Sequence, residues 1–327
     1  MTPAISVIVP LYNKAPFIQR ALQSIAAQTH RDFEAIIVDD GSTDDSARIA
    51  SEFTDSRFRV LSQPNAGPGA ARNRGAREAE ADWLAFLDAD DEWDAAYLKE
   101  SLELVNNTAN PSAVASGSWE YPAATSNEPL WRSRGLGDGP FRLTPQTDPR
   151  LAIEALAFMH PPTTIVRAEV FRRAGGFYEH GCRYGEDAYL WLNVLLQETV
   201  AFQLKPLVRI HTDASGLSNN FVRQTPIEPF LTDPDPMVSA CPTELRPLLA
   251  SMLAIRAFKR ACVLGYWGNP GAARSLRQRF IAPGSWKLPY YFPALAAGTS
   301  LAGFAGKIVR SLKQPAGANR ETTPPPK

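Results

Sequence analysis

The chain has 327 residues, and its 34 Lys and Arg residues balance its 34 Asp and Glu residues, so its formal net charge is zero. This balance provides no overall basic field of the kind that attracts nucleic acid, and we exclude a nucleic-acid partner. Apolar residues make up 44% of the chain, enough for the core of one large domain or of one domain with an appendage. The three cysteines are scattered, which is typical of a reducing compartment and indicates a cytoplasmic protein.

The first third of the chain alternates predicted strands and helices. Short apolar, β-branched runs predict strands over 5–10, 33–38, 58–61 and 83–87. Helical spacing and capping residues predict helices over 16–27, about 44–53 and about 69–80. The first strand begins so early that no signal peptide is expected before it. Four strands that alternate with helices over short connections predict a parallel sheet with helices on both faces.

Carboxylates gather at the predicted carboxyl ends of two of these strands. Asp39 and Asp40 end the second strand, and Asp88, Asp90 and Asp91 follow the fourth. Ligands of parallel sheets bind outside the carboxyl ends of the strands, so the two groups should converge. Carboxylates this close repel one another, and a divalent cation relieves the repulsion. Asp88 and Asp90 therefore indicate a site for Mg²⁺ or Mn²⁺ and a diphosphate, with Asp91 as a helix cap; the alternative is an acidic turn before the next helix.

Four segments of this region resemble the opening motifs of family 2 glycosyltransferases, which are inverting enzymes of the GT-A fold that use nucleotide sugars. In chain order and at ordinary spacing, they are Val7–Asn13, Ile37–Asp44, Gly69–Gly75 and Leu87–Asp91. The resemblance implies an α/β domain of the GT-A fold, with a mostly parallel sheet flanked by helices. It also implies that Asp88 contacts the ribose and diphosphate of a nucleotide-sugar donor.

The resemblance places the rest of the nucleotide on residues of the same region. A carboxylate at Asp40 can accept the imide N–H of uracil, a donor that adenine lacks, so we expect a UDP-linked donor; Asp39 is the less favoured contact. Pro10 and Tyr12 would wall the base, with core packing as the alternative for Tyr12. Arg72 resembles the arginine that reaches the nucleotide, and its alternative is a solvated helix face.

Two later motifs extend the resemblance. Gly185–Leu192 matches the family's Glu-Asp motif at a helix start. The match implies that Asp187 is the base that removes the acceptor's hydroxyl proton, and that Glu186 supports it or touches the acceptor. The alternative is that both acids only favour a helix N-terminus. Val208–Ser215 resembles a late Arg-x-His motif, so His211 would complete the metal shell or would be a structural histidine near a strand end.

The remaining segments give weaker signals. Residues 119–150 contain five prolines and no hydrophobic period, which predicts an irregular loop that faces the acceptor. The resemblance fades beyond residue 220. We therefore divide the chain into a catalytic domain over 1–220, a helical extension over 221–313 and a disordered tail over 314–327.

The helical extension contains an uncharged stretch, residues 288–306. It has the length of a membrane span, but prolines and glycines dilute its apolar character. Aromatic residues and flanking Lys and Arg predict a helical pair that either contacts the inner face of the cytoplasmic membrane or packs on a partner. Burial in the soluble fold is the alternative.

Together these features predict an inverting, metal-dependent transfer of a sugar from a nucleotide donor to an acceptor hydroxyl. The family-level expectation adds a glycan or lipid-linked saccharide acceptor and a setting in bacterial surface polysaccharide or lipopolysaccharide assembly. One alternative is transfer to a polyprenyl phosphate, which is already ionised and does not need Asp187 as a base. Another is a non-catalytic protein that only binds nucleotide sugars, which would have no use for a base.

Overall fold

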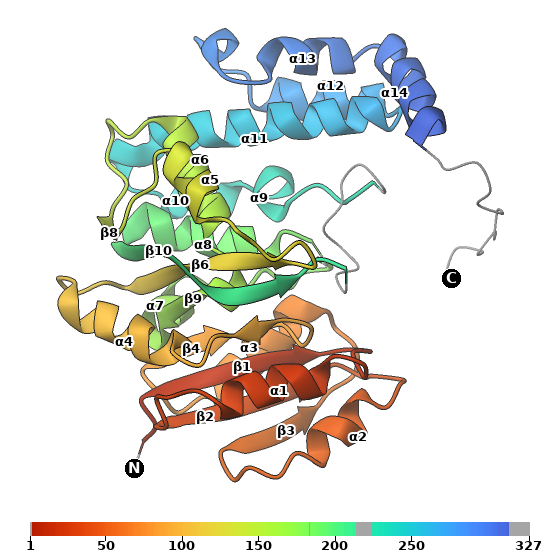
Figure 1. Ribbon diagram of the computed structural model, residues 1–327. Coiled ribbons are helices and arrows are strands. Elements are labelled where there is room, and N and C mark those ends of the chain that lie inside the picture. The colour runs from red at the N-terminus through yellow and green to blue at the C-terminus, as the bar shows by residue number, and fades with distance from the viewer. Residues whose placement is uncertain (1, 183, 214–223, 314–327) are drawn as a thin grey trace. The chain divides into compact units, whose positions relative to one another are not determined.

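The computed structural model describes residues 2–182, 184–213 and 224–313 (Figure 1). Its strands are β1 (Ile5–Leu11), β2 (Phe33–Asp39), β3 (Phe58–Ser62), β4 (Trp83–Phe86), β5 (Glu92–Trp93), β6 (Ala113–Tyr121), β7 (Thr125–Ser126), β8 (Gly139–Phe141), β9 (Thr164–Arg167) and β10 (Val200–His211). They form one sheet in the order β3-β2-β1-β4-β9-β6-β10-β5, with β7 beside β6 and β8 beside β10.

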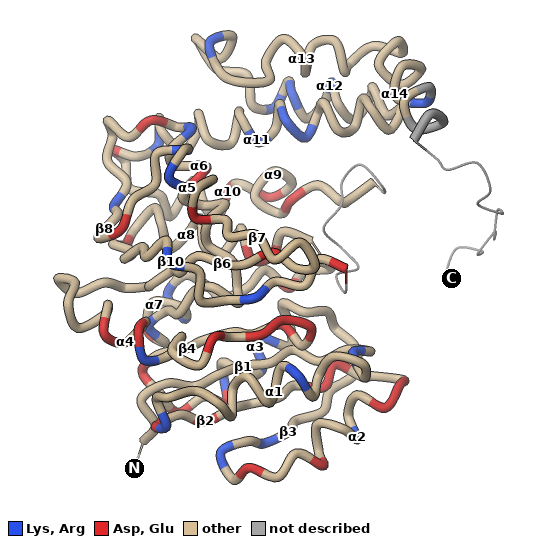
Figure 2. Tube along the Cα trace, in the orientation of Figure 1, with Lys and Arg blue, Asp and Glu red and all other residues tan. Residues whose placement is uncertain are grey.

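The N-terminal part of the sheet is parallel, as predicted, and the whole sheet is mixed. β1 pairs in parallel with β2 and β4, and β2 with β3. β9 runs antiparallel to both β4 and β6, and β10 runs parallel to β6. β4, β6 and β10 therefore point the same way, so β10 ends at the same edge as β1, β2 and β4. Figure 2 shows an acidic run directly after β4 at this edge.

Helices cover both faces of the sheet. In this part of the chain they are α1 (Ile18–Ala26), α2 (Ser46–Ser51), α3 (Pro68–Glu78), α4 (Tyr97–Asn107), α5 (Glu128–Ser133), α6 (Pro149–Phe158), the 3-10 turn η1 (Pro161–Thr163), α7 (Ala168–Arg173), α8 (Glu186–Gln197), α9 (Pro229–Thr232), α10 (Asp235–Ala240) and η2 (Thr243–Leu245). Alternate residues of β1 and β2 pack on α1 in one core cluster, and the opposite face of β2 packs on α3 in another. Gly75 permits the close approach of α3 to β1, because a Cβ there would meet the Ile8 side chain at 2.5 Å.

Residues 119–150 are more regular than predicted, since they contain the end of β6, β7, α5 and β8. The Asn127 side chain accepts the Ser118 N–H at 2.9 Å and donates to the Ser118 hydroxyl at 2.6 Å. Trp131 packs edge-on against Phe158, with 5.5 Å between ring centroids. The prediction of an irregular loop is wrong. The helices and strands of this segment are short and are held by single side-chain contacts, so they give the sequence no hydrophobic period that would reveal them. Its role toward the acceptor remains a prediction.

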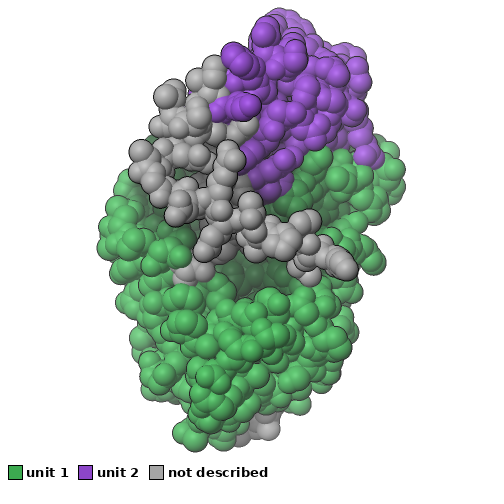
Figure 3. All heavy atoms as spheres, turned by 90° about the vertical axis from the view of Figure 1, so that its right-hand side faces the viewer, with its two compact units in different colours: residues 1–218, 226–252 green, residues 219–225, 253–327 purple. Residues whose placement is uncertain are grey.

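Two compact units divide the chain (Figure 3): residues 1–218 with 226–252, and residues 219–225 with 253–327. The second unit takes most of α11 (Arg246–Tyr266), then α12 (Pro270–Arg279), η3 (Ser285–Lys287), α13 (Tyr291–Ala297) and α14 (Ser300–Lys313). The uncharged stretch 288–306 is thus divided between two helices. In the described part of the chain, no helix is long and apolar enough to cross a membrane. The predicted tail over 314–327 lies outside the described residues.

Candidate active site

Arg72 joins residues from distant parts of the chain at the carboxyl edge of the sheet. Its guanidinium donates to Asp88 Oδ1 at 2.6 Å and to Glu186 Oε1 at 3.0 Å. It also lies over the Phe177 ring, 5.1 Å from the centroid. Burial lowers the pKa of Arg72, but Asp88 and Glu186 outweigh this effect and raise it, so the side chain stays charged. Arg72 therefore does not lie on a solvated helix face.

The Glu-Asp pair begins α8. Gly185 precedes it with φ of +78°, a left-handed conformation that favours glycine. Glu186 and Asp187 lie in the first turn, where carboxylates interact well with the helix dipole. Burial raises the pKa of Asp187 although Arg72 opposes the shift, and burial together with Asp187 raises the pKa of Glu186. A raised pKa makes a carboxylate a stronger base once it has lost its proton.

The acids after β4 are crowded and only partly compensated. Lys14 Nζ lies 2.5 Å from Asp90 Oδ2. Burial and the neighbouring Asp88 raise the pKa of Asp90, although Lys14 opposes the shift. Burial, Asp88 and Asp90 together raise the pKa of Asp91. A cation added beside these carboxylates would therefore be favoured.

Asp91 does not cap the next helix. α4 begins at Tyr97 with Ala96 as its N-cap, and no side chain caps it. In the turn before the helix, Asp94 Oδ1 accepts the Ala96 N–H at 3.0 Å. Asp91 instead accepts the backbone N–H of His211 at 2.8 Å. The prediction of a cap is wrong because β5 intervenes between the acidic run and α4, which turns Asp91 toward the end of β10.

His211 lies at the end of β10 with its imidazole already paired. Its Nε2 lies 2.8 Å from Glu92 Oε1, and its ring stacks on Tyr121 with 5.1 Å between centroids. These contacts fit the alternative of a structural histidine near a strand end. Its role as a metal ligand remains a prediction.

Asp88 and Asp90 suit a divalent cation whose remaining coordination positions would be filled by the substrate. Among the residues that the structure describes, no three His, Cys, Asp or Glu side chains assemble as a metal site. Asp88 and Asp90 nevertheless offer the hard oxygen donors that Mg²⁺ and Mn²⁺ prefer, and the Asp88 side chain is 32% exposed. Mg²⁺ is commonly held by one or two carboxylates and substrate phosphates rather than by a closed protein cage. The negative charge around Asp90, which Lys14 compensates only in part, agrees with this arrangement.

Asp39 and Asp40 have different surroundings. The Asp40 carboxylate is 2% exposed and accepts the Gln63 side-chain amide at 2.8 Å and the backbone N–H groups of residues 66 and 67 at 2.9 and 2.8 Å. Asp40 thus anchors the loop before α3. Asp39 Oδ1 accepts the Ser42 N–H at 3.1 Å. Within the described residues, Asp39 Oδ2 has no hydrogen-bond partner, so it can still accept a ligand N–H.

The predicted walls of the base lie at the end of β1. Pro10 is half-buried, and Tyr12 is 46% exposed. This exposure rules out core packing for Tyr12. The following Asn13 has φ of +50°, and its side-chain oxygen accepts the Thr43 N–H at 2.8 Å. The loops after β1 and β2 are therefore fixed to one another beside Asp39.

Sequence reasoning missed Asn73, which ties α3 to the segment before α8. Its side chain accepts the Phe177 N–H at 2.9 Å and donates to the Phe177 carbonyl at 2.8 Å. Gly176, with φ of +72°, makes room, since a Cβ there would meet Asn73 Oδ1 at 2.6 Å. Asn73 thus holds Phe177 beneath Arg72. In sequence it is only one polar residue on an Ala-rich helix.

Asn73→Ala is expected to cost about 1–3 kcal/mol in the free energy of unfolding, because two backbone groups of Phe177 lose their partner in a buried place. Urea denaturation would measure the loss. Arg77→Ala on the exposed side of the same helix is the matched control and should change the free energy by less than about 0.5 kcal/mol. Similar losses in the two variants would contradict this role for Asn73.

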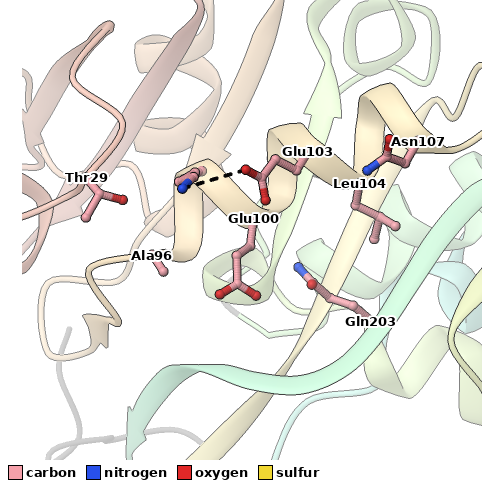
Figure 4. A pocket seen from close by; sticks show the side chains of 8 residues that line it. Thr29, Ala96, Glu100, Glu103, Leu104, Asn107 and Gln203 are labelled. Atoms are coloured by element: carbon pink, nitrogen blue, oxygen red, sulfur yellow. Dashed lines mark ion pairs between the residues drawn. The ribbon is translucent and has the colours of Figure 1, made fainter.

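The surface hollow in Figure 4 lies apart from these residues. It is lined by Thr29, Ala96, Lys99, Glu100, Glu103, Leu104, Asn107 and Gln203. Lys99 and Glu103 form an ion pair at 3.8 Å on its rim. The lining includes no predicted site residue, and we do not assign the hollow to the donor.

The sheet order, the helices on both faces and the acids at the strand ends define an α/β domain of the GT-A type. The family model described as glycosyl transferase family 2 matches residues 6–175. This is more than half of the chain, and the chain belongs to that family. The match contains the segments of Asp39, Arg72, Asp88 and Asp90 and ends before Glu186, so the roles of the later motifs remain predictions.

Curated relatives are glycosyltransferases by name. An uncharacterized glycosyltransferase of Rickettsia felis is 29% identical over 219 residues, which cover 67% of this chain and 34% of the relative. EpsJ of Bacillus subtilis, an uncharacterized glycosyltransferase, is 30% identical over 192 residues, which cover 58% of this chain and 55% of the relative. The chain therefore spans between a third and just over half of the length of these relatives.

Solved structures confirm the predicted fold. TarS 1–349 of S. aureus, in complex with UDP-GlcNAc, matches with a TM-score of 0.56 at 18% identity, over 86% of this chain and 89% of that chain. The mannosyltransferase PcManGT from Pyrobaculum calidifontis, in complex with GDP-Man and Mn²⁺, matches with a TM-score of 0.54 at 19% identity, over 96% and 88%. At these identities the likeness establishes the fold alone.

Proposed function

We propose that this protein is an inverting glycosyltransferase that moves a sugar from a nucleotide-sugar donor to an acceptor hydroxyl. The observation that carries the proposal is that Arg72 forms two ion pairs, one with Asp88 and one with Glu186. They bring Asp88, at the end of β4, beside the first turn of α8, although Arg72 and Glu186 are 114 positions apart. Asp88, which could hold the cation that binds the donor diphosphate, thus lies at the same edge of the sheet as the helix start that carries the proposed base.

Asp187 is the base in this proposal. As the acceptor oxygen attacks the anomeric carbon, its proton passes to the Asp187 carboxylate, the new C–O bond forms and the bond to the nucleotide diphosphate breaks. Burial makes Asp187 more basic, while the nearby Arg72 charge opposes the shift and favours the ionised form. Glu186 is held by Arg72 at 3.0 Å and positions the start of α8.

A divalent cation, Mn²⁺ or Mg²⁺, belongs to the proposal. Asp88 and Asp90 would hold it, and when bound it would stabilise the charge on the departing diphosphate. The Mn²⁺ in the PcManGT complex supports a divalent cation on this fold. Lys14 is paired with Asp90 and Arg72 with Asp88, so in this proposal both cations would add positive charge near the diphosphate.

For the base of the donor, the hydrogen bonds favour Asp39 over Asp40. The Asp40 carboxylate is occupied by the loop before α3, whereas Asp39 Oδ2 remains able to accept the imide N–H of uracil. A UDP-linked donor agrees with the UDP-GlcNAc complex of TarS. Guanine also carries an N–H donor, which fits the GDP-Man complex of PcManGT.

Asp39→Asn is expected to weaken UDP binding by about tenfold or more and to flatten the preference for UDP over CDP, because a hydrogen bond to a charged acceptor contributes about 1.5–3 kcal/mol. Calorimetric titration with both nucleotides would measure this. Asp40→Asn is the comparison: it should lower thermal stability more than selectivity, since it disturbs the anchored loop. Selectivity lost in Asp40→Asn and kept in Asp39→Asn would return the base contact to Asp40.

Two other functions predict different results. A polyprenyl-phosphate glycosyltransferase would act on an ionised acceptor, and a non-catalytic binder would release no nucleotide. Release of UDP from a UDP-sugar, with and without Mn²⁺, tests the proposal against the binder.

The acceptor we propose is a glycan or lipid-linked saccharide at the inner face of the cytoplasmic membrane, as in surface polysaccharide or lipopolysaccharide assembly. The feature that supports this location is the composition of the C-terminal helices.

A further inference from the structure

The neutral total charge conceals a separation of charge along the sequence. Residues 245–327 contain 13 Lys and Arg and a single acid, Glu321, which gives a formal charge of +12. Residues 1–244 contain 21 Lys and Arg and 33 acids, a formal charge of −12. No acid occurs between residues 245 and 313. Figure 2 shows the basic positions on α11 and α12. Arg260 is buried, so the attraction for an anionic partner would come from the other basic residues of this segment.

Exposed apolar side chains concentrate in the same segment. Among the described residues, eleven large hydrophobic side chains are exposed, and eight of them lie between residues 281 and 309. The eight are Ile281, Trp286, Tyr290, Phe292, Leu295, Leu301, Phe304 and Val309. Three of these, Phe292, Leu301 and Phe304, are more than 60% exposed, at 64%, 75% and 66%. Scattered apolar residues are normal on a surface, but such a concentration marks an interaction site.

On α13 and α14, small residues lie against the neighbouring helices, and several large apolar residues are exposed. On α13, Ala297 is buried while Phe292 and Leu295 are exposed. On α14, Gly306 lies so close to α11 that a Cβ there would meet the Tyr266 carbonyl oxygen at 2.0 Å, while Phe304 is exposed. Beside these small residues, Tyr291 packs edge-on against Phe258 of α11, with 5.4 Å between ring centroids. The exposed Phe292 and Phe304 are not buried by the packing of these helices.

We infer that the C-terminal helices dock on the surface of a membrane that contains anionic lipids. The exposed aromatic and aliphatic side chains would enter the headgroup region, where Trp and Tyr are favoured, and Lys287 and Lys307 would remain in water beside the phosphates. Each basic side chain near such a surface adds to the attraction, and salt screens it. This inference deepens the membrane setting of the proposed function, but it rests on charge and exposure and does not depend on catalysis.

A second copy of the chain is the competing occupant, because residues 1–244 are acidic. The surface of residues 1–244 does not match the apolar surface of residues 281–309. Outside residues 281–309, the exposed large hydrophobic side chains of the described chain are only Tyr12, Leu130 and Val238. Eight apolar side chains would therefore meet few apolar partners on that surface. A bilayer with anionic headgroups offers negative charge and an apolar layer together.

Sedimentation of the full chain with vesicles tests the inference. We expect binding to vesicles of phosphatidylcholine with phosphatidylglycerol, little binding to phosphatidylcholine alone, and a loss of binding as salt rises. A triple variant, Phe292→Ser with Leu301→Ser and Phe304→Ser, should bind about tenfold or more weakly, because it removes buried apolar area at the contact. The matched control, Leu130→Ser with Val238→Ser, changes exposed apolar residues elsewhere and should bind as the wild type does.

Equal binding to neutral and anionic vesicles, or equal losses in the triple variant and the control, would overturn the inference. A concentration-dependent dimer in analytical ultracentrifugation, abolished in the triple variant and without vesicle binding, would assign the face to a second copy. The helix content by far-UV circular dichroism, compared with that of the wild type in the absence of ligand, checks that the triple variant is folded. Because vesicle binding is measured without donor or acceptor, its failure is distinguishable from a failure of the proposed transfer.

Discussion

Asp187→Asn is expected to lower the rate of sugar transfer to a hydroxyl acceptor by about 10²–10⁴-fold, the usual share of general base catalysis. The variant keeps the shape and hydrogen bonding of the side chain but cannot take a proton at neutral pH. Donor and metal binding should be unchanged, because in our proposal Asp88, Asp90 and Arg72 hold the donor. Single-turnover transfer at saturating donor, compared between wild type and variant, measures the effect on the chemical step.

The comparison needs an acid that shares only the position of Asp187 on a helix. Asp235 lies in the first turn of α10 and is exposed, so Asp235→Asn should leave transfer unchanged. A phosphate acceptor should be affected much less by Asp187→Asn, since it carries no proton to remove. Equal single-turnover rates in wild type and Asp187→Asn would take Asp187 out of the mechanism and leave only its favourable place at the helix N-terminus.

The same residue gives the transfer rate a dependence on pH. Burial raises the folded-state pKa of Asp187 above the ordinary value of about 3.9. Because the base acts only when deprotonated, kcat/KM should fall as pH drops through that raised pKa, and Asp187→Asn should lack this acid limb. A group with a raised folded-state pKa contributes stability below its unfolded pKa and loses it as pH rises through the folded one. Asp187→Asn should therefore be at least as stable as wild type at pH 7.

The N-terminal sheet could be predicted from the sequence because its signals are local. β-branched runs define strands within a few residues, and helices between them determine a parallel order. The position of the acids at strand ends follows from that order alone. The antiparallel β9 could not be predicted in the same way, because its pairing with β4 and β6 depends on contacts between residues far apart in the chain.

Arg72 and Asp40 show why the candidate site could be predicted only in outline. Arg72 precedes Arg74 and Arg77 on an Ala-rich helix, a pattern that resembles a solvated face, and its burial depends on Phe177, which is distant in sequence. The sequence favours Asp40 for the base contact, because a carboxylate can accept the imide N–H of uracil. In the structure its carboxylate accepts the Gln63 side-chain amide and two backbone N–H groups of the loop before α3. Residue types alone do not reveal backbone donors.

The C-terminal helices show a different limit of prediction from sequence: the net charge of a whole chain can hide opposite charges in its parts. A net charge of zero excludes a basic field only if the charges are mixed along the chain. Here the acids end at Glu244 and the next one is Glu321, so the average describes neither part. The exposed fractions of Phe292 and Phe304 then separate a solvent-facing apolar surface from a buried one, which hydropathy alone could not do.

Asp90→Asn is expected to lower transfer in the presence of Mn²⁺ by about 10²–10³-fold, comparable to the loss of one preorganised electrostatic contact in an active site. The neutral amide removes one ligand charge, so a divalent cation and the donor diphosphate would be held less tightly. UDP affinity should also lose most of its dependence on Mn²⁺. Calorimetric titration of UDP with and without Mn²⁺ measures this without reference to activity.

Lys14→Met is the matched variant for Asp90→Asn, because Lys14 is the cation now paired with the Asp90 carboxylate at 2.5 Å. Its removal leaves the carboxylate charge in place and takes away a competitor for it, so Mn²⁺ binding in the absence of nucleotide should tighten. The two variants should thus shift Mn²⁺ affinity in opposite directions, which general damage to the loop after β4 would not do. Near-normal turnover of Asp90→Asn in Mn²⁺ would reduce Asp90 to a partner of Lys14 and remove it from the metal site.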